Sequence, residues 1–235
     1  MADTAKDLRK RENTRARIIE AAADVFVDKG LEGAKIDDVV KAAGFSRGAF
    51  YSNYSSMQEL MRDVIVARSK RILDTVDEAV DALGNDATID SVMTVLDAIH
   101  GQGRAMYILT TEFNLYRMRH PEAFEEGPDT IAERRHFEDR LSGIIIAVLA
   151  KMGRRALFPP GTIAHVISVF YLDALVSSEG DPNAELLRQV VESVIIAFSQ
   201  SIDAASGGAE APCGDVTVEG VDHLISFIKR TAAQG

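Results

Sequence analysis

The residues whose types and spacing could do chemistry are concentrated in one short stretch, GFSRGAFYSNY, at positions 44–54. Gly44 can take the left-handed conformation that ends one helix, and Ser46 is a suitable N-cap for another. Arg47 would then lie in the first turn of that second helix, where a guanidinium can bridge O6 and N7 of a guanine. Groups that could bind backbone phosphates follow at Tyr51, Asn53 and Tyr54. The stretch therefore predicts contact with an anionic partner.

Three predicted helices must position this stretch. The helix before the glycine has its apolar face at Ile36, Val39 and Val40, and the helix after it covers about residues 47–53. A longer amphipathic helix precedes both, with Ile18, Ala22 and Phe26 on its inner face and Gly30 at its end. Two short helices joined by a tight turn form a helix-turn-helix, whose second helix enters the major groove of DNA.

Charge is distributed unevenly along the chain. Residues 1–72 contain 14 Lys and Arg against 11 Asp and Glu, so their formal charge is +3, and the remainder carries −13 of a total of −10. The cations are densest at Lys6, Arg9, Lys10, Arg11, Arg15 and Arg17. A solvated helix face would also explain this run, but the asymmetry favours an anionic partner for the N-terminal part alone.

The rest of the chain has the periodicity of helices, with no convincing alternating strand pattern, so the predicted fold class is all-α. A long fourth helix starts near Ser56 and reaches about Leu83. Further helices are expected at 88–100, 103–119, 129–152, 160–179 and 183–203. Residues 205–217 are expected to form a linker and residues 218–235 a C-terminal amphipathic helix.

Patterns typical of enzymes and metal sites are sparse. Glu133-x-x-His136 places a carboxylate and an imidazole on one helix face, as in di-iron bundles, but the second such motif is missing. The five histidines lack zinc spacing, and the single cysteine, Cys213, cannot form a disulfide or a cysteine cluster. We therefore expect no catalytic residue, no cofactor and no metal, with a di-iron enzyme as the rival interpretation.

Taken together, IDDVVKAAGFSRGAFYSNYSSMQEL resembles the DNA-binding segment of TetR-type transcriptional regulators. The positions that carry the resemblance are Ala43, Gly44, Phe45, Ser46, Gly48, Tyr51, Tyr54, Glu59 and Leu60. The preceding segment RARIIEAAADVFVDKGLEGAKI is similar to the family's first helix, so the resemblance covers about residues 12–65. The later segment LTTEFNLYRMRHPEAFE resembles a sixth-helix pattern common in such proteins.

The resemblance implies a role for each matched position. Arg47, Gly48, Ala49 and Tyr51 would face the bases, while Ser46, Asn53, Tyr54, Arg15 and Arg17 would face the DNA backbone. Two positions depart from the family pattern. Lys35 stands where Thr is usual, and it can reach a phosphate but cannot cap a helix; Met57 stands where Lys is common. We expect the basic arm from Lys6 to Arg17 to compensate for the lost backbone contacts.

The acidic remainder is expected to sense a small molecule and to dimerise. Candidates for an effector pocket are Met93, Leu96, His100, Tyr107, Thr110, Thr111, Asn114, Met118 and Phe137, a mix that suits an apolar ligand with a few hydrogen bonds. The last two long helices are apolar over more than one face. The resemblance implies that they form a homodimer interface, through residues such as Val166, Phe170, Ala174, Val190, Val194 and Phe198.

The sequence thus predicts an N-terminal three-helix DNA-binding domain (1–55, with a basic arm at 1–11) joined to a helical effector-binding and dimerisation domain (56–204). The expected partners are a pseudo-palindromic DNA operator, a small-molecule effector and a second copy of the chain. The expected function is a transcriptional repressor released by its effector. No apolar run approaches the roughly 20 residues of a membrane-spanning helix, so we expect a cytoplasmic, nucleoid-associated protein. A helical adaptor that binds only protein is the remaining alternative.

Overall fold

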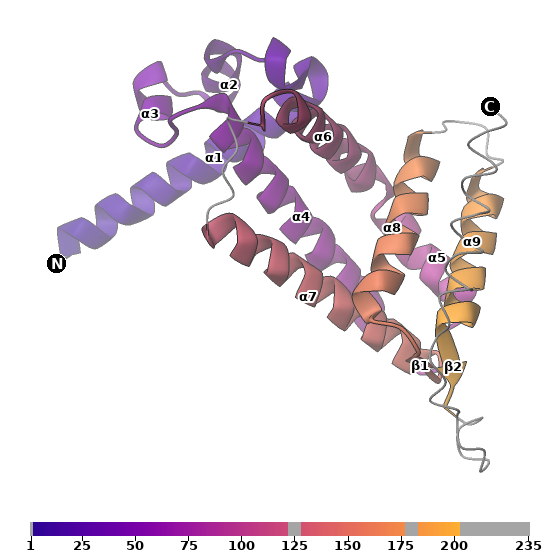
Figure 1. The fold of residues 1–235 in the computed structure, drawn as a ribbon. Coiled ribbons are helices and arrows are strands. Elements are labelled where there is room, and N and C mark those ends of the chain that lie inside the picture. The colour runs from indigo at the N-terminus through magenta and orange to yellow at the C-terminus, as the bar shows by residue number, and fades with distance from the viewer. Residues whose placement is uncertain (1, 122–127, 177–182, 203–235) are drawn as a thin grey trace, which may run out of the picture. The chain divides into compact units, whose positions relative to one another are not determined.

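The computed structural model describes residues 2–121, 128–176 and 183–202. The helices in these ranges are α1 (Ala2–Gly33), α2 (Ile36–Ala43), α3 (Arg47–Tyr51), α4 (Met57–Asp81), α5 (Ile89–Ala98), α6 (His100–Arg119), α7 (Pro128–Lys151), α8 (Pro160–Val176) and α9 (Asn183–Phe198) (Figure 1). The prediction of an all-α fold is confirmed. The expected linker and C-terminal helix lie outside the described residues.

Side-chain caps explain where the short N-terminal helices begin. The Ser46 hydroxyl accepts a hydrogen bond from the backbone N–H of Ala49 at 3.3 Å, and α3 follows. At the start of α2 the cap comes from the third residue of the helix, because the Asp38 carboxylate accepts from the backbone N–H of Lys35 at 3.0 Å. Gly44 ends α2 with φ 72° and ψ 34°, the left-handed conformation expected from the sequence.

The first helix continues past the glycine at which the sequence predicted its end. Gly30 has φ 69° and ψ 175°, so α1 is kinked there before its last residues. This combination of angles is open to glycine almost alone. The glycine was therefore correctly read as a break in the helix, but the chain resumes a helical course for a few residues before α2.

Buried side chains form two clusters. The N-terminal cluster joins α1, α2, α3 and the start of α4 with Leu109 of α6, and includes Ile18, Phe26, Val39, Phe50 and Leu60. The C-terminal cluster joins the remainder of α4 with α5, α7, α8 and α9, and includes Leu73, Val148, Ile163 and Val191. Helix α4 contributes buried residues to both clusters, and Figure 1 shows it running from the region of α1 to that of α5 and α7.

A small strand pair closes one end of the C-terminal cluster. Strands β1 (Arg154–Ala156) and β2 (Ser199–Ser201) pair antiparallel, with Arg155 opposite Gln200. Arg154 donates from Nε to the buried hydroxyl of Ser199 at 2.7 Å. The sequence placed residues 183–203 in the last long helix, and this was wrong for residues 199–202: α9 ends at Phe198, and the next three residues pair with β1. Residue 203 lies outside the described residues. Three-residue strands are too short to show an alternating pattern.

In the part of the chain that the structure describes, no helix is both long enough and apolar enough to cross a membrane. The same residues contain no group of three or more His, Cys, Asp or Glu side chains placed to hold a metal ion. The side chain of Glu133, proposed with His136 as half of a di-iron motif, lies outside the described residues.

Candidate nucleic-acid interface

The short helix α3 is anchored by one face and presents the other to solvent. Phe50 has no exposed surface and lies in the N-terminal cluster, whereas its neighbour Tyr51 is 61% exposed. The Arg47 side chain is 62% exposed at the start of the helix, next to the exposed Gly48. Because α3 is fixed from below by Phe50, the residues predicted to face bases share an outward surface, except that Ala49 is half-buried.

The guanidinium of Arg47 is held by a carboxylate of the preceding helix. Its Nε donates to Oδ1 of Asp37 at 2.5 Å, and its Nη2 donates to Oδ2 of the same residue. This pairing lowers the pKa of Asp37 below its ordinary value, chiefly through the hydrogen bonds from Arg47, and raises the pKa of Arg47 for the same reason. Nothing in the sequence spacing indicated this partner, because an acid in the first turn of a helix is already favoured by the helix dipole.

Two residues expected to bind DNA phosphates are instead engaged by Asp63 of α4. Arg15 donates to Asp63 Oδ2 from Nε at 3.0 Å and from Nη2 at 2.5 Å, and the Tyr54 hydroxyl donates to the same oxygen at 3.0 Å. Tyr54 is only 2% exposed, and burial raises the pKa of its hydroxyl. The structure therefore places Tyr54 in the core, where its hydrogen bond to Asp63 links the segment after α3 to α4. Arg15, whose side chain is 44% exposed, binds the same carboxylate from α1.

The other residues that were predicted to contact the DNA backbone lie close to α3. The Arg17 guanidinium lies over the Phe45 ring, 4.7 Å from its centroid, and Nη2 donates to the carbonyl of Ala43 at 3.3 Å. Asn53 donates from Nδ2 to the carbonyl of Ala49 at 2.8 Å. Lys35 is exposed beside α2, where the Asp38 carboxylate supplies the cap that a lysine side chain cannot. Arg17 and Lys35 are thus exposed cations next to the helix-turn-helix.

Comparison with known proteins bears on this surface. Residues 18–64, which include α2, α3 and their flanking turns, match the family model described as bacterial regulatory proteins, tetR family. Residues 18–64 are therefore similar to the DNA-binding domain of TetR-family regulators. The prediction made from the motif GFSRGAFYSNY is confirmed.

The curated relatives are transcriptional regulators by name. SrpR of Pseudomonas putida, an HTH-type transcriptional regulator, is 35% identical over 91 residues, which are 38% of this chain and 41% of that protein. TtgW, an uncharacterized HTH-type transcriptional regulator of the same species, is 35% identical over 89 residues, 37% of this chain and 63% of that one. The chain therefore spans about half the length of the curated relatives that it matches.

The structure of GusR from Salmonella enterica shares the fold. It aligns with a TM-score of 0.57 and 19% identity over 78% of this chain and 96% of that one. At this identity the likeness shows a common fold beyond the DNA-binding domain and no more.

The TetR resemblance also implied an effector pocket, whose nine candidate residues are spread over different environments. Met93, Leu96 and Phe137 pack as half-buried side chains against the C-terminal cluster. Tyr107, Thr110 and Thr111 are half-buried on α6, where the Thr110 hydroxyl donates to the carbonyl of Met106 at 2.8 Å. His100, Asn114 and Met118 are exposed. Neither of the two pockets described below is lined by any of these nine residues.

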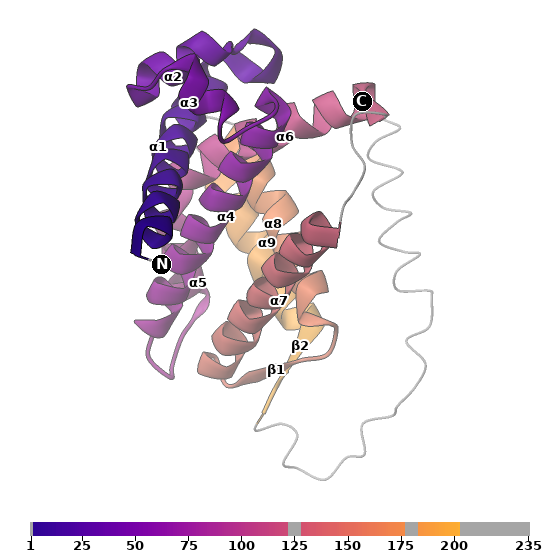
Figure 2. The same ribbon diagram turned by 90° about the vertical axis from the view of Figure 1, so that its left-hand side faces the viewer.

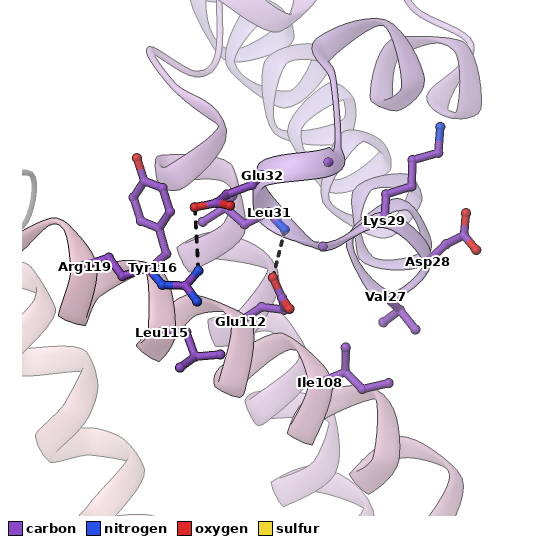
Figure 3. Close-up of a pocket in the computed structure, with 12 residues that line it drawn as sticks. Val27, Asp28, Lys29, Leu31, Glu32, Ile108, Glu112, Leu115, Tyr116 and Arg119 are labelled. Carbon is purple, nitrogen blue, oxygen red and sulfur yellow. Dashed lines mark hydrogen bonds and ion pairs between the residues drawn. The ribbon is translucent and has the colours of Figure 1, made fainter.

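The larger pocket, of about 510 Å³, lies between the kinked end of α1 and helix α6 (Figure 3). At its centre the Glu112 carboxylate accepts a hydrogen bond from the backbone N–H of Leu31 at 3.4 Å. At its rim Arg119 lies 3.9 Å from the Glu32 carboxylate. A smaller pocket of about 160 Å³ lies between α1, α4 and α6. No sequence pattern indicated the larger pocket, because its two walls are some 80 residues apart.

The six residues predicted for a dimer interface lie partly inside the C-terminal cluster. Val194 is buried, and Val166, Ala174, Val190 and Phe198 are half-buried against it. Phe170 is 42% exposed on α8. Other large apolar side chains exposed on these two helices are Val169, Leu186 and Ile196. The predicted face is therefore partly used within the chain, and the apolar surface left at the outside includes three residues that the prediction did not name.

Proposed function

We propose that the chain is a sequence-specific DNA-binding regulator of transcription, in which α3 enters the major groove of its operator. The observation that carries the proposal is the geometry of α3. Its first turn is capped by Ser46, its inner side is locked by the fully buried Phe50, and Arg47 and Tyr51 stand outward from it. A helix with a fixed base and polar groups at its N-terminal edge is what major-groove recognition requires.

The charge distribution supports the same orientation on DNA. The +3 of residues 1–72 is accompanied by exposed Arg17 and Lys35 beside α3, whereas the remaining −13 would be repelled by phosphates. The side chains at 2–10, which hold part of the basic arm, lie outside the described residues, although α1 itself begins at Ala2. Binding through the N-terminal end alone leaves the acidic helices to act away from the DNA.

We infer further that the regulator works as a homodimer on a pseudo-palindromic operator and acts as a repressor that a small molecule releases. Exposed Val169 and Phe170 on α8 and Leu186 and Ile196 on α9 support pairing through these helices, since apolar surface of this kind favours association. Two-fold pairing would place two α3 helices on successive turns of one DNA face. An effector would act only by preferring the state that cannot bind DNA.

Fluorescence anisotropy with the full chain tests the proposal. The probe is duplex DNA from upstream of the protein's own gene and duplexes selected in vitro from a random pool, each titrated at several salt concentrations beside a scrambled duplex. We expect specific binding that Arg47→Ala weakens by about 1–3 kcal/mol. Tyr51→Phe, which removes only a hydroxyl, should have a smaller effect.

Arg104→Ala is the matched control, because it removes one exposed cation from α6, away from α3. It should leave operator affinity unchanged. If Arg47→Ala binds the operator as tightly as wild type, the chain is still a sequence-specific regulator, but the role proposed for Arg47 is wrong. If the wild-type chain selects no sequence from the random pool, the proposal fails and the protein-binding adaptor becomes the better interpretation.

A further inference from the structure

The pairing between Arg47 and Asp37 uses only one side of the guanidinium. Asp37 accepts from Nε, at 2.5 Å, and from Nη2. An arginine has five N–H donors in a planar fork, so this side-on contact occupies one donor on each of those two nitrogens. Both donors of Nη1 and the second donor of Nη2 remain on the outer edge. Those two nitrogens form the end-on pair that fits O6 and N7 of a guanine.

The two residues are arranged to hold this geometry across the helix-turn-helix. Asp37 is in the first turn of α2 and Arg47 is the first residue of α3, and Figures 1 and 2 show the two helices side by side at the same end of the molecule. The adjacent Asp38 is already engaged, because it caps α2 and binds Lys29 Nζ at 2.7 Å. The two neighbouring acids therefore have different tasks, and only Asp37 reaches the reading helix.

Stability does not explain the contact. The side chains of Arg47 and Asp37 are 62% and 59% exposed, and ion pairs this open contribute little to folding because water screens them. A carboxylate at a DNA-facing surface also repels phosphates, so it weakens general affinity for DNA. What the pair does supply is a fixed conformation of the Arg47 side chain. A long side chain that is immobilised before binding loses less conformational freedom when it meets its base.

We propose that Asp37 is a positioning residue for base recognition: it fixes Arg47 side-on so that the outer edge of the guanidinium is presented to a guanine of the operator. The inference rests on the proposed function of α3. In this role Asp37 contributes to the discrimination between bases and not to the affinity for DNA of any sequence. Removing the carboxylate should therefore weaken discrimination between bases while leaving or raising the affinity for unrelated DNA.

The test uses the full chain and an operator selected in vitro from random duplexes. Affinity is measured for that operator, for copies in which each guanine in turn is replaced by 7-deazaguanine, which lacks the N7 acceptor, and for a scrambled duplex. For wild type we expect one guanine per half-site whose replacement weakens binding about tenfold. In Asp37→Asn this penalty should fall several-fold, while affinity for the scrambled duplex stays the same or rises.

Asp28→Asn is the matched control, because it makes the same change in charge at an exposed position of α1. It should leave the guanine penalty unchanged. In an Arg47→Ala background, Asp37→Asn should have no further effect on the penalty. Circular dichroism of Asp37→Asn should show wild-type helix content and an unchanged melting curve, which separates positioning from misfolding.

Three results would overturn the inference while the regulator stands. First, the loss of affinity caused by 7-deazaguanine could be the same in Asp37→Asn as in wild type. Second, it could be larger, which would make Asp37 a restraint that holds Arg47 away from the base. Third, Asp37→Asn could change it equally with and without Arg47. Failure of the wild-type chain to select any sequence would instead remove the proposed function, and this inference with it.

Discussion

The two buried clusters of this molecule are packed to different degrees. Most members of the N-terminal cluster have no exposed surface, including Phe26, Phe50 and Leu60. Among the described members of the C-terminal cluster only Ile163 and Val191 are less than 2% exposed, and most others keep 6% to 8% of their surface. The N-terminal cluster is therefore a closed core within one chain. The other end retains accessible apolar surface, which is consistent with a part that binds something further.

The two regions also differ in how far apart in the sequence the residues lie that determine their structure. The turn and the start of α3 are set by residues close in sequence, such as Gly44 and the Ser46 cap, and Arg15 and Asp63 hold Tyr54 just after the helix. The C-terminal cluster is assembled from five helices, and its accessible surfaces depend on how these pack. A functional surface of the first kind can be recognised from a short motif, whereas one of the second kind cannot.

The largest effect is expected from one identical truncation made in each cluster. Leu60→Ala and Leu187→Ala remove the same atoms, but Leu60 is fully enclosed and Leu187 is 8% exposed. Leu-to-Ala changes in cores cost about 2–5 kcal/mol, and the cost rises with the cavity that remains. We expect Leu60→Ala near the upper end and Leu187→Ala near the lower, measured by urea unfolding.

Unfolding should be followed at two protein concentrations, because the stability of a native dimer rises with the logarithm of protein concentration. A dimer built on α8 and α9 would make Leu187→Ala more costly as concentration rises. Equal costs for the two truncations at low concentration would contradict the difference in packing.

A smaller effect is expected at the kink of α1, where it meets α6. Gly30 has backbone angles that are costly for any other residue, and a Cβ there would lie 2.8 Å from Oε2 of Glu112. Gly30→Ala should therefore lower the free energy of unfolding by about 1–3 kcal/mol. The measurement is urea or thermal unfolding followed by circular dichroism.

Gly33→Ala is the control, since its Cβ would meet its nearest neighbour at an ordinary 3.7 Å and its backbone angles are not restricted. It should be neutral. Adding Glu112→Ala to Gly30→Ala should recover the part of the loss that comes from the collision and none of the part that comes from the backbone. A neutral Gly30→Ala would show that α1 does not need its kink.

Sequence reasoning succeeded where a signal was local. Gly44 and Ser46 correctly placed the turn and the start of α3, and apolar spacing placed the long helices to within a few residues. It missed what depends on distant partners. For Tyr54 the motif allowed both a core role and a phosphate contact, and it could not indicate the Asp63 partner, which lies in α4. The end of α9 was predicted too late because a strand pairing sets it. The contact of Glu112 with Leu31 joins residues with no shared pattern.

The smallest effect concerns surface charge, on which we expect the two regions to be alike. Glu20 of α1 accepts from Arg71 of α4 at 2.9 Å, and Arg140 of α7 donates to Asp74 of α4 at the same distance on the other side. The hydrogen bonds from Arg71 lower the pKa of Glu20 below its ordinary value of 4.5. A carboxyl whose folded pKa is depressed adds stability above its unfolded pKa, and that stability is lost as pH falls through the folded value.

Glu20→Gln should therefore lower stability slightly at pH 7, and the difference from wild type should be smaller at pH 3, because falling pH protonates Glu20 and removes the contribution of its charge. With the side chain 54% exposed, solvent screening limits the difference at pH 7 to about 0.5 kcal/mol. Melting curves at both pH values measure it, with Glu78→Gln, an exposed carboxylate of α4, as the control. A larger loss would mean that charge as well as packing distinguishes the N-terminal cluster. A small loss leaves the enclosed core around Phe50 as the reason that this end is rigid enough for the proposed role of α3.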